Sequence, residues 1–137
     1  MSDVSDDVAD QVIGRLKFNE DGLIPAVAQQ FDTGEMLMLA WMNADAIRET
    51  LATGRACYFS RSRGRLWRKG ETSGQVQALK EFRFDCDEDT VLLLVDQTGV
   101  ACHTGRHNCF FHAVRDGDIR VIAEPEVTPE ALYGGKD

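Results

Sequence analysis

The sequence has no long apolar run and no N-terminal targeting pattern. None of its 137 residues belongs to a segment that approaches the ~20 apolar residues needed for a membrane-spanning helix. Residues 1–10 are acidic and polar, without the positive start and apolar stretch of a secretory signal. We therefore expect a cytoplasmic protein that does not bind a membrane.

Cysteine is also scarce, with four residues at Cys57, Cys86, Cys102 and Cys109. A chain of this length can bury a core of its own, so it does not need disulfides for stability. Spacing alone leaves two disulfides possible, but in a reducing compartment clustered cysteines more often bind metals or act in catalysis. Cys57 lies in an apolar stretch and is expected to pack in the core.

Internal repeats, low-complexity tracts and an interdomain linker are absent from the sequence. We predict a single domain over residues 1–137, with its core at about 23–115 and loosely held termini at 1–12 and 124–137. Short strand patterns separated by glycine-containing turns indicate a strand-dominated α+β class with one main helix. That helix follows Asn43, an N-cap residue, and ends at Gly54, a residue suited to the left-handed C-terminal position. The expected strands are 23–31, 36–41, 56–60, 66–68, 76–84, 90–95 and 109–115, with a last edge at 119–122.

The net charge of −8 argues against a general nucleic-acid-binding protein. Cations are nevertheless concentrated in residues 55–70, which contain no acid and which we call the basic island. Its cations are Arg55, Arg61, Arg63, Arg65, Arg68 and Lys69. A solvated hairpin tip would also collect arginines. Hydroxyl groups at Ser60, Ser62, Thr72 and Ser73, together with nearby glycines, favour phosphate binding instead.

The segment from Asp85 to Cys109 has the composition of a metal site. It contains three cysteines, Cys86, Cys102 and Cys109, the aspartates Asp85, Asp87 and Asp89, and His103. Thiolates favour zinc, whereas carboxylates favour magnesium, calcium or manganese. An EF-hand loop is excluded, because Thr90 and Asp96 occupy the positions of its glycine and glutamate. The alternative to metal binding is that the three aspartates cap a solvent-exposed turn.

Three thiolates leave the fourth position of a zinc ion for a water, whose pKa falls towards ~7 on the metal. Hydrolysis is therefore the natural hypothesis, with His103 as a proton shuttle or a fourth ligand. Only their proximity to Cys109 supports His107 and His112 as functional residues.

Two other classes of protein remain open. One is a structural zinc module whose basic island binds nucleic acid or phosphate ligands. The other is a redox protein using Cys102 and Cys109, although their spacing is not the usual Cys-x-x-Cys.

Four ordered motifs make the chain strongly resemble the phosphoribosyl-AMP cyclohydrolase family over about Leu23 to Val114. They are Ser60-Arg61-Ser62-Arg63, then Trp67-Arg68-Lys69-Gly70-Glu71-Thr72-Ser73-Gly74, then Asp85-Cys86-Asp87-x-Asp89, and Ala101-Cys102-His103-Thr104-Gly105 followed by Cys109-Phe110. Asn108 departs from the family pattern, which has a serine before the last cysteine.

The resemblance implies the third step of histidine biosynthesis, hydrolytic opening of the adenine ring of 1-(5-phosphoribosyl)-AMP between N1 and C6. It also implies an intertwined homodimer with one zinc per subunit, in which Cys86 of one chain joins Cys102 and Cys109 of the other. Asp85, Asp87 and Asp89 would bind magnesium, and His103 would be the catalytic residue that transfers the proton. The nucleotide substrate and its two phosphates would contact Ser60, Arg61, Ser62, Arg63, Trp67, Lys69, Thr72 and Ser73, with Trp67 either stacking on the substrate or simply packing.

Overall fold

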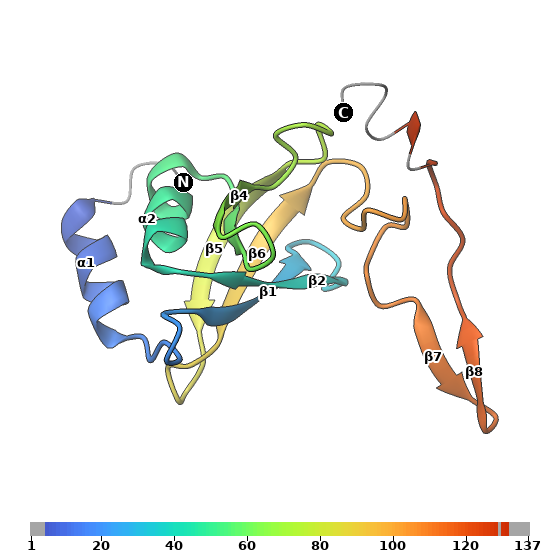
Figure 1. Cartoon of the computed structure of the whole chain (residues 1–137), viewed down its shortest axis with the longest axis horizontal. Helices are drawn as coiled ribbons and strands as arrows, with labels where there is room; N and C mark the ends of the chain where they lie inside the picture. The colour runs from blue at the N-terminus through green and yellow to red at the C-terminus, as the bar shows by residue number, and fades with distance from the viewer. Residues whose placement is uncertain (1–4, 129, 132–137) are drawn as a thin grey trace.

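The computed structural model describes residues 5–128, 130 and 131, and over these residues it has the predicted strand-dominated α+β architecture (Figure 1). The helices are α1 (Asp6–Arg15) and α2 (Ala44–Thr53). The strands are β1 (Ile24–Gln30), β2 (Met36–Met42), β3 (Cys57–Ser60), β4 (Arg65–Arg68), β5 (Gln77–Phe84), β6 (Val91–Gln97), β7 (His112–Arg115) and β8 (Asp118–Val121). No helix in this described part of the chain combines the length and apolarity that crossing a bilayer demands.

A four-stranded sheet in the order β2-β1-β6-β5 forms the centre of the fold. Its two inner strands, β1 and β6, run parallel, with Ala26 opposite Val91 and Ala28 opposite Leu93. The outer strands β2 and β5 each pair antiparallel to an inner one. Alternate residues of β1 and β6 are fully buried, and Ile47 and Leu51 of α2 pack into the same core. The core of the fold therefore lies along β1 and β6, and loops leave it at the two ends of β6.

Helix α2 begins and ends where the sequence predicts. The Asn43 side chain accepts a hydrogen bond from the Ala46 N–H at 2.8 Å, which satisfies one of the free donors of the first turn. Gly54 adopts a left-handed φ of 75° at the C-terminal end. The Thr50 hydroxyl accepts a hydrogen bond from Cys57 N–H at 2.9 Å and so joins α2 to β3. These caps confirm the predicted helix.

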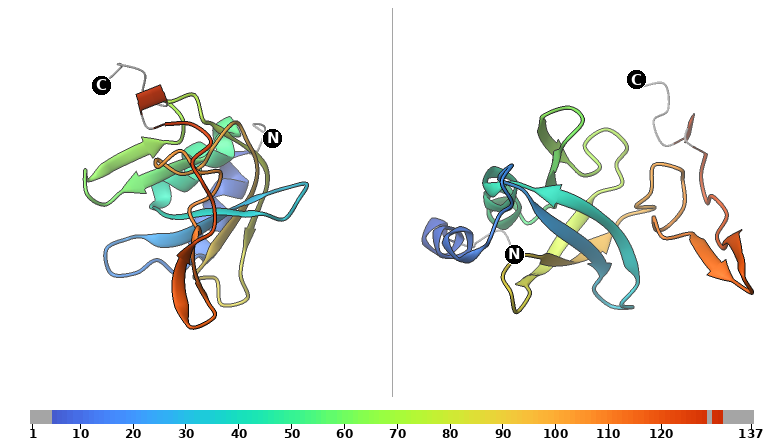
Figure 2. Two further views of the ribbon diagram at one scale, coloured as in Figure 1. Left: turned by 90° about the vertical axis from the view of Figure 1, so that its right-hand side faces the viewer. Right: turned by 60° about the horizontal axis from the view of Figure 1, so that its bottom comes forward.

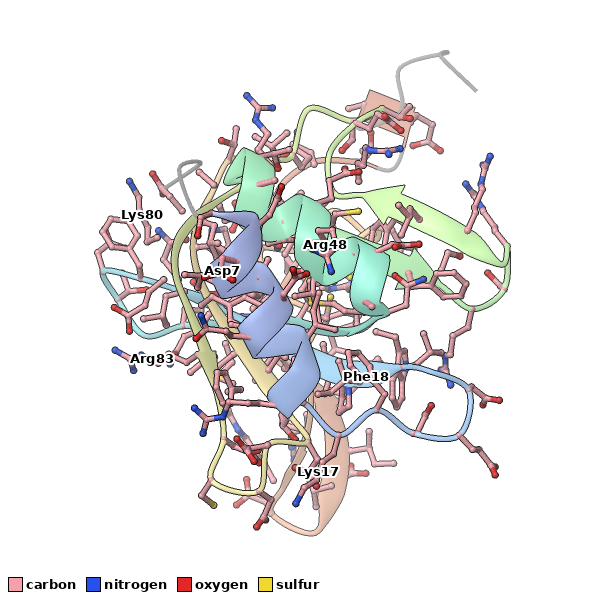
Figure 3. All side chains as sticks on the ribbon, turned by 90° about the vertical axis from the view of Figure 1, so that its left-hand side faces the viewer. Asp7, Lys17, Phe18, Arg48, Lys80 and Arg83 are labelled. Carbon is pink, nitrogen blue, oxygen red and sulfur yellow. The ribbon has the colours of Figure 1, made fainter. Side chains whose placement is uncertain are left out.

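Helix α1 corrects the prediction of one main helix. From Asp6 onwards it also corrects the prediction of a loosely held segment at residues 1–12, of which residues 1–4 lie outside the described residues. Ser5 caps α1 through a hydrogen bond from Val8 N–H, and Ala9 is buried. Arg48 of α2 forms an ion pair with Asp10 of α1 at 2.8 Å, and Figure 3 shows α1 lying across the α2 side of the molecule. Ala9 is the one buried residue of α1, so this helix adds little to the core. Its Ser5 cap and its acidic first turn are the signals that could have indicated it from the sequence.

The C-terminal part of the chain forms a separate hairpin of β7 and β8 that projects away from the central sheet (Figure 2). The predicted strand at 109–115 begins only at His112, because the Cys109 N–H is bonded to the carbonyl of Leu37 on β2. The expected edge strand at 119–122 is β8, displaced by one residue. Both hairpin strands were thus predicted, but not their separation from the sheet.

The predicted loose tail at 124–137 is also corrected in part. The Glu126 N–H donates to the Gly105 carbonyl at 2.8 Å, and the Arg106 side chain donates to the Ala123 carbonyl at 2.7 Å. Residues 123–127 therefore form a strap across the loop that carries the last two cysteines. The remainder of the predicted tail, apart from residues 128, 130 and 131, lies outside the described residues.

Candidate functional site

The basic island forms one wall of a cavity of about 1070 Å³ beside the β3–β4 hairpin. Short strands and tight turns hold this wall, because Arg63 N–H bonds to the Ser60 hydroxyl and Gly74 N–H to the Gly70 carbonyl. The cavity brings together most of the predicted substrate and catalytic residues: Ser60, Ser62, Arg63, Trp67, Lys69, Thr72, Ser73 and His103. Exposed cations and hydroxyls on one concave surface suit an anionic ligand.

Arg61 differs from its neighbours in the basic island, because it does not line this cavity. Its guanidinium lies 4.8 Å from the ring centroid of Trp41 on β2, where a cation–π contact stabilises it. Arg68 is a lining residue but is held by Glu49 through two hydrogen bonds of 2.6 and 2.9 Å. Within the described residues, Arg63 and Arg65 line the cavity without an ion pair. Arg65 was therefore missed as a candidate binding residue, although the sequence places it in the island.

A second cavity, of about 260 Å³, connects the basic island to the cysteines. Trp67, Lys69, Ser73 and His103 line both cavities, and the second one also reaches Cys102 and Cys109. Trp67 is 40% exposed and presents its ring between the two ends. His103 is exposed at the boundary. The geometry therefore forms a single path with cations at one end and sulfur at the other.

Cys102 and Cys109 lie side by side at the sulfur end of this path. Burial, and then the neighbouring Cys102, raise the pKa of the Cys109 thiol to about 12. The Cys102 sulfur accepts a hydrogen bond from the Thr104 hydroxyl at 3.1 Å. Zinc is commonly bound by cysteine sulfurs, so two adjoining cysteines, one buried and one half-buried, fit this metal. The pair supplies two of the three predicted thiolates.

Glu35, in the turn between β1 and β2, anchors the cysteine loop from one side. Its carboxylate accepts hydrogen bonds from His107 Nδ1 at 2.9 Å and Asn108 Nδ2 at 2.7 Å. Burial would raise the pKa of Glu35, but the bonds from Asn108 and His107 hold it below its usual value. His107 and Asn108 thus have a structural role beside Cys109, which the sequence alone did not indicate because Glu35 lies so far away along the chain.

Cys86 lies at the other end of the sheet from the cysteine pair. It follows β5 in an exposed turn before β6, whereas Cys102 follows the far end of β6 (Figure 1). The seven residues of β6 alone separate these ends by roughly 20 Å at about 3.3 Å per residue. A single chain therefore cannot bring all three predicted zinc ligands to one metal ion.

The three aspartates next to Cys86 do come together. Asp85, Asp87 and Asp89 offer carboxylate oxygens that all lie within 4.8 Å of one another. The Asp85 carboxylate also accepts the Asp89 N–H at 3.1 Å, and Glu88 turns the chain with a φ of 62°. Hard oxygen donors at this spacing fit magnesium. In the described part of the chain this is the one cluster of three or more potential ligands.

Cys57 lies in the hydrophobic core, as predicted. It is 1% exposed, and burial together with the Glu49 carboxylate raises the pKa of its thiol to about 12. A protonated, inaccessible thiol is unreactive and is a poor metal ligand. His112 begins β7, and its ring packs against Phe111 outside both cavities.

Comparisons with a family model and with individual known proteins lead to the same family. A family model described as phosphoribosyl-AMP cyclohydrolase matches residues 38–111. A protein of that name from Magnetococcus marinus is 66% identical over 89% of this chain and 95% of its own length. Another of that name, from Rhodospirillum centenum, is 65% identical over 93% of this chain and 96% of its own length. The match covers both the basic island and the segment from Asp85 to Cys109.

The strap lies so close to Gly105 that we expect no larger side chain to be tolerated at this position. A Cβ atom there would lie 1.8 Å from the Val127 carbonyl oxygen, and Gly105 has a φ of 87°. Gly105→Ala should therefore lower the free energy of unfolding by about 2–4 kcal/mol in denaturant titration. Gly117→Ala is the matched control, because Gly117 has a φ of 75° with nothing within 4 Å. Gly117→Ala should lower the free energy of unfolding only by the backbone strain, about 1–2 kcal/mol. If both variants lose the same free energy of unfolding, the strap does not pack closely against Gly105.

Proposed function

This chain belongs to the phosphoribosyl-AMP cyclohydrolase family, and from that premise we propose how its residues perform the reaction. It is an enzyme, a hydrolase that acts on a cyclic amidine. It opens the adenine ring of 1-(5-phosphoribosyl)-AMP between N1 and C6 in the histidine biosynthetic pathway. We further propose that the protein acts in the cytoplasm, as a homodimer that uses zinc and magnesium.

The connected pair of cavities is the observation that carries this proposal. The substrate has phosphate monoesters at its ends and a positively polarised adenine ring between them. Arg63 and Arg65 line the exposed end and form no ion pair with any other described residue, and serine and threonine hydroxyls lie beside them. In this proposal the adenine ring extends past Trp67, which would stack on it, towards the cysteine end; Trp67 lines both cavities. Two ends of different chemistry therefore match two parts of the substrate.

Zinc would be held by Cys102 and Cys109 together with Cys86 of the partner subunit. With three thiolate ligands and an open fourth position, a bound zinc ion supplies a water of lowered pKa at neutral pH. This chain's residues orient the substrate so that C6 faces the sulfur end. The reaction adds a water oxygen to C6 and breaks the C6–N1 bond, and a proton must reach N1. His103 lines both cavities and is our candidate for moving that proton.

A homodimer is supported by the separation of the ligands and by an exposed apolar hairpin. Cys86 is too far from Cys102 in one chain to share its metal, so the partner copy must supply it. On the β7–β8 hairpin, Val114 is 79% exposed and Ile119 is 74% exposed. Exposing two such side chains to water is unfavourable, and covering them lowers the free energy of the protein. An intertwined dimer would cover them and complete two zinc sites.

Magnesium would bind the oxygen cluster of Asp85, Asp87 and Asp89. This cluster flanks Cys86 in the same turn, so in the dimer it would lie close to the zinc and to the substrate. Carboxylates bind magnesium through few direct contacts and leave several waters in place. The aspartates would therefore hold a hydrated ion beside the reacting nucleotide.

Subunit complementation tests the shared zinc site. Cys86→Ala and Cys102→Ala should each bind no catalytic zinc and show no turnover alone. When the two variants are unfolded, mixed and refolded with zinc, heterodimers should contain one intact site and restore about a quarter of the wild-type activity. A mixture of Cys102→Ala and Cys109→Ala is the matched control. Both cysteines come from the same subunit of each zinc site, so every site in the heterodimer still lacks one ligand and no activity should be restored. Without recovery in the first mixture, zinc is not shared in this way.

Asp87→Asn tests the separation of the two metals. Loss of one carboxylate charge should raise the magnesium concentration for half-maximal activity on the order of tenfold, while bound zinc is unchanged. The measurements are magnesium-dependent turnover and zinc content by elemental analysis. Asp21→Asn, an exposed acid outside the cluster, should change neither. If Asp87→Asn also loses zinc, the aspartates and thiolates form one site.

A further inference from the structure

Lys69 differs from every other cation of the basic island. It is 8% exposed, whereas Arg55, Arg61, Arg63, Arg65 and Arg68 are all exposed. Among the described residues it is the only buried one with a formally charged side chain. Its position is fixed through the backbone, because the Lys69 N–H donates to the Ala56 carbonyl at 3.2 Å. A buried ammonium group needs a compensating charge.

The surroundings of Lys69 do not contain that charge as a carboxylate. Within the described part of the chain, no carboxylate lies within salt-bridge distance of Lys69. Its Nζ atom lies 5.9 Å from the ring centroid of Trp67, on the path between the two cavities. Lys69 lines the same cavity of about 260 Å³ as Cys102 and Cys109. Of the side chains that line this cavity, only these two cysteines can carry a negative charge.

This placement does not suit the predicted phosphate contact. Lys69 lines both cavities, but it is buried, whereas the arginines that would bind phosphate are exposed. The second cavity also reaches the cysteines. Three thiolates around a zinc ion leave one net negative charge in a largely buried site. An ammonium group beside them offsets that charge and is in turn stabilised by it. Each group thus removes the electrostatic cost of burying the other.

We propose that Lys69 is a positioning residue that balances the charge of the zinc–thiolate cluster and so sets its affinity for zinc. This inference rests on the proposed function, because it requires that Cys102 and Cys109 hold the metal. Lys69 acts through those thiolates. Its removal should therefore weaken zinc binding and slow turnover, with little effect on the binding of the substrate phosphates.

The test compares Lys69→Met, which keeps the chain length and removes the charge, with Lys69→Arg, which retains a cation. Zinc affinity is measured by competition with a chromophoric chelator, and kcat and KM are measured on zinc-loaded protein. We expect Lys69→Met to weaken zinc binding by roughly 10–100-fold. Its kcat should fall at least about tenfold with KM changed less than about threefold, because transition-state stabilisation is lost rather than ground-state binding. Lys69→Arg should restore much of the zinc affinity.

Arg63→Met is the matched control from the same wall of the cavity. It should raise KM and leave zinc affinity unchanged. If Lys69→Met instead behaves like Arg63→Met, Lys69 is a phosphate ligand and the inference is wrong. Unchanged zinc affinity in Lys69→Met would also overturn it. Should the Met variant not fold, Lys69→Gln is measured in the same way.

A Cys109→Ala variant separates this inference from the function on which it rests. If Cys109→Ala loses zinc while Lys69→Met retains wild-type affinity, the zinc site stands and the role of Lys69 is rejected. If Cys109→Ala retains zinc, the proposed metal site itself is wrong, and with it the assignment of Lys69.

Discussion

The pairing of β6 between β1 and β5 is the constraint on which the rest of this structure depends. Because β6 is extended over seven residues and paired on both sides, it fixes the distance between the turn before it and the loop after it. The turn carries the aspartates and Cys86, and the loop carries Cys102 and Cys109. A shared metal is then possible only if a second copy places its turn against this loop. The proposed shared zinc site therefore requires a dimer.

The cysteine loop is in turn held on both sides by parts of the chain that lie far away in sequence. Glu35 binds His107 and Asn108 from the β1–β2 turn, and the strap at residues 123–127 covers Gly105 from the opposite direction. Such outer contacts commonly orient metal ligands. The cavity beside the loop is correspondingly divided into an exposed region with arginine and a buried region with lysine and sulfur.

Local patterns predicted those parts of the molecule that local chemistry determines. Asn43 and Gly54 fix the ends of α2 because capping depends on a few neighbouring residues. The strands could be recognised from their apolar runs and turns. Helix α1 was missed, although its Ser5 cap and its acidic first turn are local signals that the sequence contains. The motifs likewise identified the candidate ligands but not the burial of Lys69 or the contact between Arg61 and Trp41, which only tertiary packing creates.

The most direct measurement is turnover of phosphoribosyl-AMP by the purified protein, followed through the ultraviolet change on ring opening, with zinc content determined on the same sample. The account predicts turnover that disappears when a chelator removes zinc and returns when zinc is restored. A folded, dimeric and zinc-loaded protein without turnover would contradict it. Such a result would favour a structural zinc module whose basic island binds phosphate ligands.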